Sequence, residues 1–218
     1  MQFDKAVIIV GKGEIHWPAL RAVSSRYDII ALDGAYDQLV ANQFIVSTVI
    51  GDLDSLSARD DIDTDKVTII AIEEQDSNDF EKAIYSITAP AFLCFGLTGK
   101  RFDHTIANIH VMAKYSDSNK LIAITCDEVI TIHRGDSQLE AKANALIAIL
   151  PLMPITFVSS GGLAYPLDGL ALAIGQMVSS SNHATTDMVT LQPAKSDTTL
   201  PYAICRPLSL FEDGVISV

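Results

Sequence analysis

Cationic residues are scarce in this sequence. The 218-residue chain has 15 lysines and arginines against 27 aspartates and glutamates, which gives a formal net charge of −12. Such a charge disfavours general binding to nucleic acid and to anionic membrane surfaces, so we expect neither as a partner. If the chain handles phosphates, local cations or a metal ion must offset its own field.

Cysteine is also scarce, and long hydrophobic runs are missing. The three cysteines follow no Cys-x-x-Cys spacing, which predicts buried reduced thiols rather than a disulfide framework. No uninterrupted apolar segment reaches the length of roughly 20 residues that spans a membrane. The first residues, MQFDKAVIIVGKGE, are typical of a first strand and not of a signal peptide. We therefore expect a soluble, cytoplasmic protein.

Hydrophobic residues make up 49% of the chain, which is ample for a core. In the first half, short apolar runs alternate with helix-length segments, and the runs are apolar throughout. This pattern is typical of a parallel sheet covered on both faces. After about residue 127, short β-type runs separated by turn residues favour an antiparallel sandwich. With the boundary at the polar SDSNK, the sequence predicts a Rossmann-like α/β domain over residues 1–118 and a β-sandwich over residues 119–218.

Acidic residues follow several of the predicted parallel strands. In an open parallel sheet, ligands bind beyond the carboxyl ends of the strands. Asp33 follows the second predicted strand, and Asp52 and Asp54 follow the third in GDLDSL. The segment EEQDSND, with Gln75 and Asp79, follows the fourth. This edge of the sheet suits Mg²⁺ bound together with phosphate oxygens, although solvated turns and a helix start also explain such acids.

The stretch GLTGKRFDH, residues 96–104, supplies the opposite charge. Its glycines let the backbone approach a phosphate, and the helix predicted after it offers free N–H groups to an anion. Arg101 can fork onto phosphate oxygens, and Lys100 adds a second cation. The alternatives are a surface loop with an Arg101–Asp103 pair, and a simple helix-start role for His104.

Four segments, in this order and spacing, resemble the thiamin pyrophosphokinase family: ALDGAYDQL, GDLDSL, QDSNDFEKAI and GLTGKRFDHTIANI. In the second half, GGLAYPLDGLALAIGQMVSSSN is similar to a Gly-Leu-x-Tyr-Pro-Leu segment and a later Ser-Asn of that family. The resemblance implies an α/β domain followed by a β-sandwich in a homodimer. It also implies transfer of the pyrophosphoryl group of ATP to the hydroxyl of thiamine, leaving AMP.

The resemblance further implies roles for individual residues. Asp52, Asp54 and Asp79 would hold Mg²⁺ and, with Arg101 and Asp103 beside the transferred group, form the catalytic set. The nucleotide-phosphate site would be lined by a second set: Asp33, Gln75, Lys100, Arg101 and His104. On the sandwich, thiamine would be approached by a third set: Tyr165, Ser179 and Asn182.

The chain departs from the family pattern in places. Ala35 and Asn78 stand where a glycine and a threonine are common, and SSSN is followed by HATTD, without an obvious aromatic residue to stack on thiamine. Two other functions fit parts of the sequence. VIGDLDSL resembles the strand-borne Asp-x-Asp of haloacid-dehalogenase-type phosphatases, although Ser55 and Leu56 follow it here. A non-catalytic thiamine- or nucleotide-binding module is the second alternative.

Overall fold

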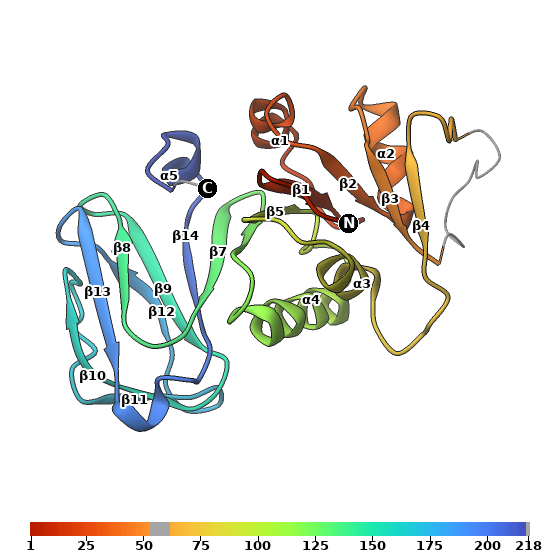
Figure 1. Cartoon of the computed structure of the whole chain (residues 1–218). Helices are drawn as coiled ribbons and strands as arrows, with labels where there is room; N and C mark the ends of the chain where they lie inside the picture. The colour runs from red at the N-terminus through yellow and green to blue at the C-terminus, as the bar shows by residue number, and fades with distance from the viewer. Residues whose placement is uncertain (53–61, 217–218) are drawn as a thin grey trace. The chain divides into compact units, whose positions relative to one another are not determined.

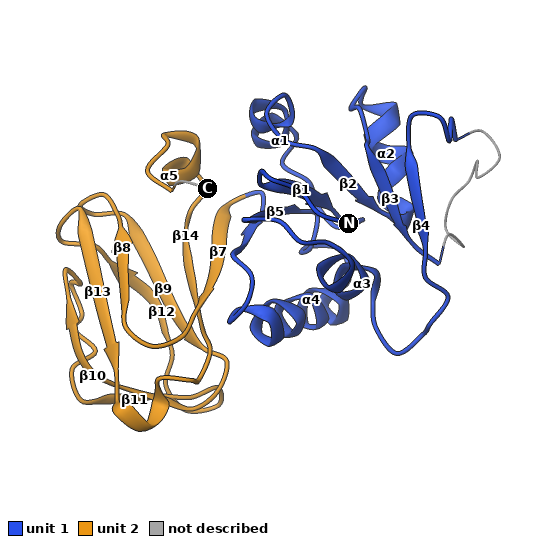
Figure 2. Cartoon of the chain, viewed as in Figure 1, with its two compact units in different colours: residues 1–126, 218 blue, residues 127–217 orange. Residues whose placement is uncertain are grey.

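The computed structural model describes residues 1–52 and 62–216 (Figure 1). The chain divides into two compact units, and the second begins at Asp127 (Figure 2). The expected boundary after residue 118 was wrong, because the division falls after Cys126. The physical reason is the strand Leu121–Ile124, which pairs in parallel with Phe92–Phe95 and so completes the sheet of the first unit.

The described part of the first unit contains six parallel strands in the order β6-β5-β1-β2-β3-β4. Their bounds are β1 (Val7–Val10), β2 (Ile29–Leu32), β3 (Thr48–Gly51), β4 (Thr68–Ala71), β5 (Phe92–Phe95) and β6 (Leu121–Ile124). Every residue of β1, β2, β3, β5 and β6 is buried, which confirms the expectation from uninterrupted apolar runs. Because the strands are parallel, their carboxyl ends share one edge, which we call the rim.

Helices cover both faces of this sheet, with α1 and α2 on one side and α3 and α4 on the other (Figure 1). Their bounds are α1 (Trp17–Ser24), α2 (Tyr36–Ala41), α3 (Asp79–Ser86) and α4 (Phe102–Tyr115). Helix α3 buries Phe80, Ala83 and Ile84, as the helical spacing predicts. In the described residues, no helix is long and apolar enough to cross a membrane.

The second unit consists of antiparallel strands. One set has the order β12-β9-β14-β7 and the other the order β11-β10-β13-β8. The bounds are β7 (Glu128–His133), β8 (Ser137–Glu140), β9 (Leu146–Pro151), β10 (Ile155–Gly161), β11 (Leu170–Leu172), β12 (Ser179–His183), β13 (Met188–Pro193) and β14 (Tyr202–Pro207). A short helix, α5 (Ser209–Glu212), follows β14.

Both strand sets contribute to one hydrophobic core. Ile149 and Ile204 from the first set pack in the same cluster as Phe157 and Leu191 from the second. This arrangement confirms the predicted antiparallel sandwich. The sequence did not predict β8, because Leu139 is the one apolar residue in its four-residue SQLE.

Candidate active site

Carboxylates meet where β2 and β3 end. Asp33 begins a short 3₁₀ turn after β2 and is 2% exposed, and Asp52 follows β3 directly. Asp79 is the first residue of α3. A Cβ on Gly51, the last residue of β3, would stand 2.7 Å from the Cβ of Asp33 and 3.3 Å from Oδ1 of Asp79. The missing side chain of Gly51 therefore lets these two carboxylates approach each other.

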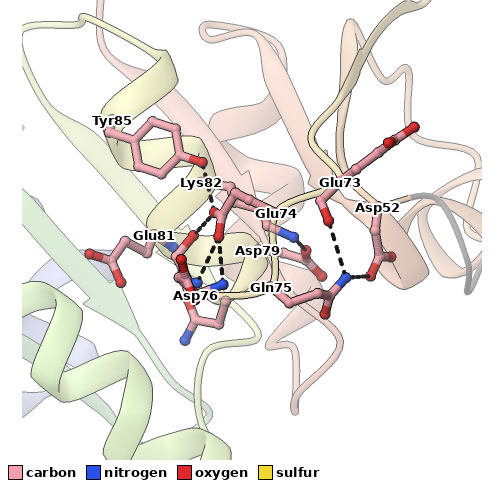
Figure 3. Close-up of polar contacts among 11 residues, drawn as sticks. Asp52, Glu73, Glu74, Gln75, Asp76, Asp79, Glu81, Lys82 and Tyr85 are labelled. Atoms are coloured by element: carbon pink, nitrogen blue, oxygen red, sulfur yellow. Dashed lines mark hydrogen bonds and ion pairs between the residues drawn. The ribbon is translucent and has the colours of Figure 1, made fainter.

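A buried ammonium faces this group. Lys82 lies one turn after Asp79 in α3, is 2% exposed, and places Nζ 3.5 Å from Oδ1 of Asp79 (Figure 3). Burial raises the pKa of Asp79, the charge of Lys82 opposes this effect, and the charges of Asp33 and Asp52 raise the pKa further. Negative charge is thus concentrated around Asp79 despite the nearby lysine.

Glu74 organises the loop between β4 and α3. Its Oε2 accepts a hydrogen bond from the backbone N–H group of Asp76 at 2.6 Å, and its Oε1 accepts one from the Tyr85 hydroxyl at 3.0 Å. Within this loop, Nε2 of Gln75 donates to Oδ2 of Asp52 at 3.4 Å (Figure 3). The loop therefore presents an amide to the carboxylates.

The loops after β1 and β5 are joined by hydrogen bonds. The backbone N–H of Gly13 donates to the carbonyl of Gly96 at 2.8 Å. Because β1 lies between β5 and β2, the connections leave this point in opposite directions, and it is the topological switch point of the sheet. The ammonium of Lys100, predicted to bind phosphate, donates to the backbone carbonyl of Lys12 at 2.7 Å.

Arg101 and Asp103 form a two-point ion pair. Nε and Nη2 of Arg101 donate to the two carboxylate oxygens at 3.1 and 2.5 Å, and both side chains are exposed. The hydrogen bonds from Arg101 lower the pKa of Asp103 to about 2. Asp103 is therefore ionised and a weak proton acceptor near neutral pH. His104 is exposed in the first turn of α4.

The residues expected to approach thiamine surround a cavity of about 310 Å³ in the second unit. Tyr165, Ser179 and Asn182 contribute polar groups to its lining. The apolar part of the lining includes Leu167, Leu170, Leu172, Met177 and Val178. An apolar cavity with a few polar groups is typical of a site for a small organic molecule.

Asn182 shapes this cavity from within the protein. It is 2% exposed; its Oδ1 accepts from the backbone N–H of Tyr165 at 3.0 Å, and its Nδ2 donates to the carbonyl of Tyr165 at 2.7 Å. These bonds hold the segment that carries the exposed Tyr165 ring. That ring meets His183 edge-on, with centroids 5.5 Å apart. The residue after SSSN, His183, thus supplies a ring that contacts Tyr165 beside the cavity.

Several residues of the site were missed from the sequence. Lys82 stands three residues after Asp79, and this one-turn spacing is the signal that identifies it as a neighbour. The role of Glu74 depends on contacts with Tyr85 and the loop backbone, which no local pattern indicates. Asp54, predicted as a metal ligand, lies outside the described residues.

The donor set on the rim suits Mg²⁺ bound together with a nucleotide. Within residues 1–52 and 62–216, no group of three or more histidine, cysteine, aspartate or glutamate side chains is gathered to hold a metal ion. Mg²⁺ usually takes one or two carboxylates and completes its shell with water and phosphate oxygens. Asp52 and Asp79, with their accumulated negative charge, fit that requirement.

Two family descriptions match the chain. The description "Thiamin pyrophosphokinase, catalytic domain" matches residues 21–124, and "Thiamin pyrophosphokinase, vitamin B1 binding domain" matches residues 116–195. Among curated relatives, thiamin pyrophosphokinase 1 of Caenorhabditis elegans is 29% identical over 186 residues, which cover 77% of this chain and 75% of the relative. Thiamine pyrophosphokinase 1 of Arabidopsis thaliana is 24% identical over 184 residues, which cover 76% of this chain and 67% of the relative.

Solved structures share the fold. Thiamin pyrophosphokinase from Candida albicans superposes with a TM-score of 0.81 at 17% identity, covering 94% of this chain and 89% of that structure. Thiamin pyrophosphokinase from Geobacillus thermodenitrificans superposes with a TM-score of 0.77 at 23% identity, covering 93% of this chain and 97% of that structure.

The fold and the rim define a class of protein: an α/β unit with carboxylates and cations at its strand ends, followed by an antiparallel sandwich with a cavity of its own. Within that class, the chain belongs to the thiamin pyrophosphokinase family, because the two matches together extend over residues 21–195.

Proposed function

We propose that the chain transfers the pyrophosphoryl group of ATP to the hydroxyl of thiamine, giving thiamine diphosphate and AMP. The observation that carries the proposal is the meeting of Asp33 and Asp79 around Gly51, beside Asp52, in a chain of this family. Phosphoryl transfer depends mainly on positioning and on stabilising negative charge, and this rim supplies charged groups at fixed positions.

In this proposal, Asp52, Asp54 and Asp79 hold Mg²⁺. When bound, the ion neutralises charge on the phosphates during transfer. Gln75 helps to fix Asp52 through their hydrogen bond. Asp33, buried beside Gly51, adds negative charge to the metal-binding part of the rim.

Cations on the other side of the rim bind the nucleotide phosphates. We assign Arg101 to the transferred group, with Asp103 keeping its guanidinium in place through the two-point pair. Since the pKa of Asp103 is lowered to about 2, a holding role suits it better than proton abstraction. Lys100 supports the loop through the carbonyl of Lys12, and His104 lies at the adjacent helix start.

Thiamine occupies the cavity of the second unit in this proposal. Its aromatic rings lie against the apolar lining and Tyr165, while the Ser179 hydroxyl supplies a polar contact. Asn182 contributes by holding the Tyr165 segment. A homodimer and a cytoplasmic location remain predictions from the family resemblance and the sequence.

The proposal is tested by incubating the purified chain with ATP, Mg²⁺ and thiamine and measuring AMP, ADP and thiamine diphosphate together. We expect AMP and thiamine diphosphate in equal amounts, and little product when Mg²⁺ is chelated or in an Asp79→Asn variant. Formation of ADP in place of AMP would contradict pyrophosphoryl transfer. Binding of both substrates without AMP release would favour the non-catalytic alternative, and hydrolysis of a phosphomonoester would favour the phosphatase.

A further inference from the structure

Lys12 places a cation at the turn after β2, against Gly34. It follows β1 in the stretch VGKGE, and its side chain extends to the turn after β2. A Cβ on Gly34 would stand 2.7 Å from Nζ of Lys12, 2.9 Å from Cδ and 3.1 Å from Cε. The lysine side chain therefore lies directly against Gly34, where the absence of a side chain leaves room for it.

The turn that Lys12 reaches also carries Asp33, one of the carboxylates of the rim. Gly34 directly follows Asp33 in the 3₁₀ turn, and Asp33 approaches Asp79 across Gly51. From the end of β1 to the end of β3, the rim therefore presents a cation and then carboxylates. A phosphate chain placed here would meet the ammonium of Lys12 on one side and, on the other, carboxylates that could hold Mg²⁺.

The backbone of Lys12 is held on both sides. Its carbonyl accepts from Nζ of Lys100 at 2.7 Å, and the next residue, Gly13, donates its N–H to Gly96 at 2.8 Å. By contrast, the exposed ammonium of Lys12 makes no hydrogen bond or ion pair with any residue of the described ranges. On a chain with a net charge of −12, an exposed lysine that pairs with none of the described carboxylates is available to an anionic ligand.

We infer that Lys12 binds phosphate oxygens of ATP and is a substrate-contacting residue of the proposed reaction. This inference rests on the proposed function. Lysine acts on phosphate as a compact point charge on a flexible stem, which suits a group that reaches across from a neighbouring loop. Loss of a single charged hydrogen bond to phosphate is expected to weaken binding about 10- to 100-fold, which corresponds to roughly 1.4–2.8 kcal/mol.

The test compares nucleotide binding by isothermal titration calorimetry in the presence of Mg²⁺. Lys12→Met and Lys12→Gln both remove the charge. Lys5→Met is the matched control, since it makes the same change in net charge just before β1, at the opposite edge of the sheet. We expect both Lys12 variants to bind ATP about 10- to 100-fold more weakly, to bind AMP within about twofold of wild type, and to raise the KM for ATP but not for thiamine.

Two results would overturn the inference. One is ATP binding by both Lys12 variants within twofold of Lys5→Met, and the other is an equal loss of ATP and AMP affinity, which would indicate a general disturbance of the loop. Neither result depends on the acceptor, because binding is measured without thiamine. If wild type forms no AMP with thiamine yet Lys12→Met still loses ATP affinity, the proposed function fails and the role of Lys12 stands.

Discussion

Lys82 makes the carboxylates at the end of β3 compatible with a folded protein. It is a buried lysine whose Nζ lies 3.5 Å from Asp79, at the place where Asp33 and Asp52 raise the pKa of that carboxyl. Lys82 is buried whereas Asp79 is 36% exposed, so the cost of losing the partner falls mainly on the lysine, whose buried charge would be left without compensation. The pair therefore has a structural role that exists before any ligand binds.

At this scale we predict the effect of Lys82→Met, which keeps the length of the side chain and removes its charge. The free energy of unfolding should fall by about 1–3 kcal/mol, and the double variant Lys82→Met/Asp79→Asn should recover part of the loss. Urea denaturation without added Mg²⁺, with Asp79→Asn completing the double-mutant cycle, measures the coupling. If the changes in the free energy of unfolding of the two single variants add up to that of the double variant, the Lys82–Asp79 pair contributes nothing to stability.

At the scale of the element, the start of α3 links three parts of the site. Oδ1 of Asn78 accepts the backbone N–H of Glu81 at 2.8 Å and caps the helix. Its Nδ2 donates to Oδ1 of Asn108 in α4 at 3.2 Å, and Nδ2 of Asn108 donates to the carbonyl of Leu97 after β5 at 2.7 Å. Asn78 stands where threonine is common in the family. In addition to the cap, it makes a second hydrogen bond through its amide nitrogen.

We predict that Asn78→Ala lowers the free energy of unfolding by about 1 kcal/mol through loss of the cap. Asn78→Thr, which restores the residue common in the family, should retain most of that stability because its hydroxyl can still accept the Glu81 N–H. Thermal and urea denaturation of the two variants side by side provide the measurement. If alanine and threonine are equally destabilising, the link to Asn108 rather than the cap is the main contribution.

At the scale of the whole molecule, acid sensitivity is expected from a partly buried histidine, His133, that packs against the core of the sandwich. Nε2 of His133 lies 2.9 Å from the hydroxyl of Thr131, and Nδ1 lies 3.3 Å from that of Ser137. The ring also stacks on Tyr202, with centroids 6.0 Å apart. Burial, assisted by the charge of Arg206, lowers the pKa of His133 from 6.5 to about 4. The folded state therefore keeps this ring neutral where the unfolded chain protonates it.

The sign of the pH effect follows from that difference. Keeping His133 neutral contributes to the free energy of unfolding in full above pH 6.5, and this contribution is lost as the pH falls toward 4. The loss amounts to about 3 kcal/mol at most. We predict that His133→Gln loses less stability than wild type over this interval, as measured by urea denaturation at several pH values. The carboxylates titrate alike in both proteins and cancel in the comparison. Parallel pH profiles would refute the assignment.

Much of the fold was predictable because its signals are local. Uninterrupted apolar runs identified the buried parallel strands, and the helical spacing in QDSNDFEKAI identified the buried face of α3. Where the signal was weak or misleading, the prediction failed. The polar SQLE concealed β8, and the polar SDSNK drew the boundary to residue 118 although the next strand pairs with β5.

The sequence by itself determined which chemistry collects at the rim, because parallel strands bring their carboxyl ends to one edge whatever the details of packing. It therefore predicted that Asp33, Asp52 and Arg101 gather at this edge, and that they form a phosphate site there. Only the tertiary structure decided how each side chain is used. The path of Lys12 over Gly34 and the bonds of Asn182 to Tyr165 join segments far apart in the chain. Such contacts depend on the space that packing leaves between segments, and no local pattern contains that information.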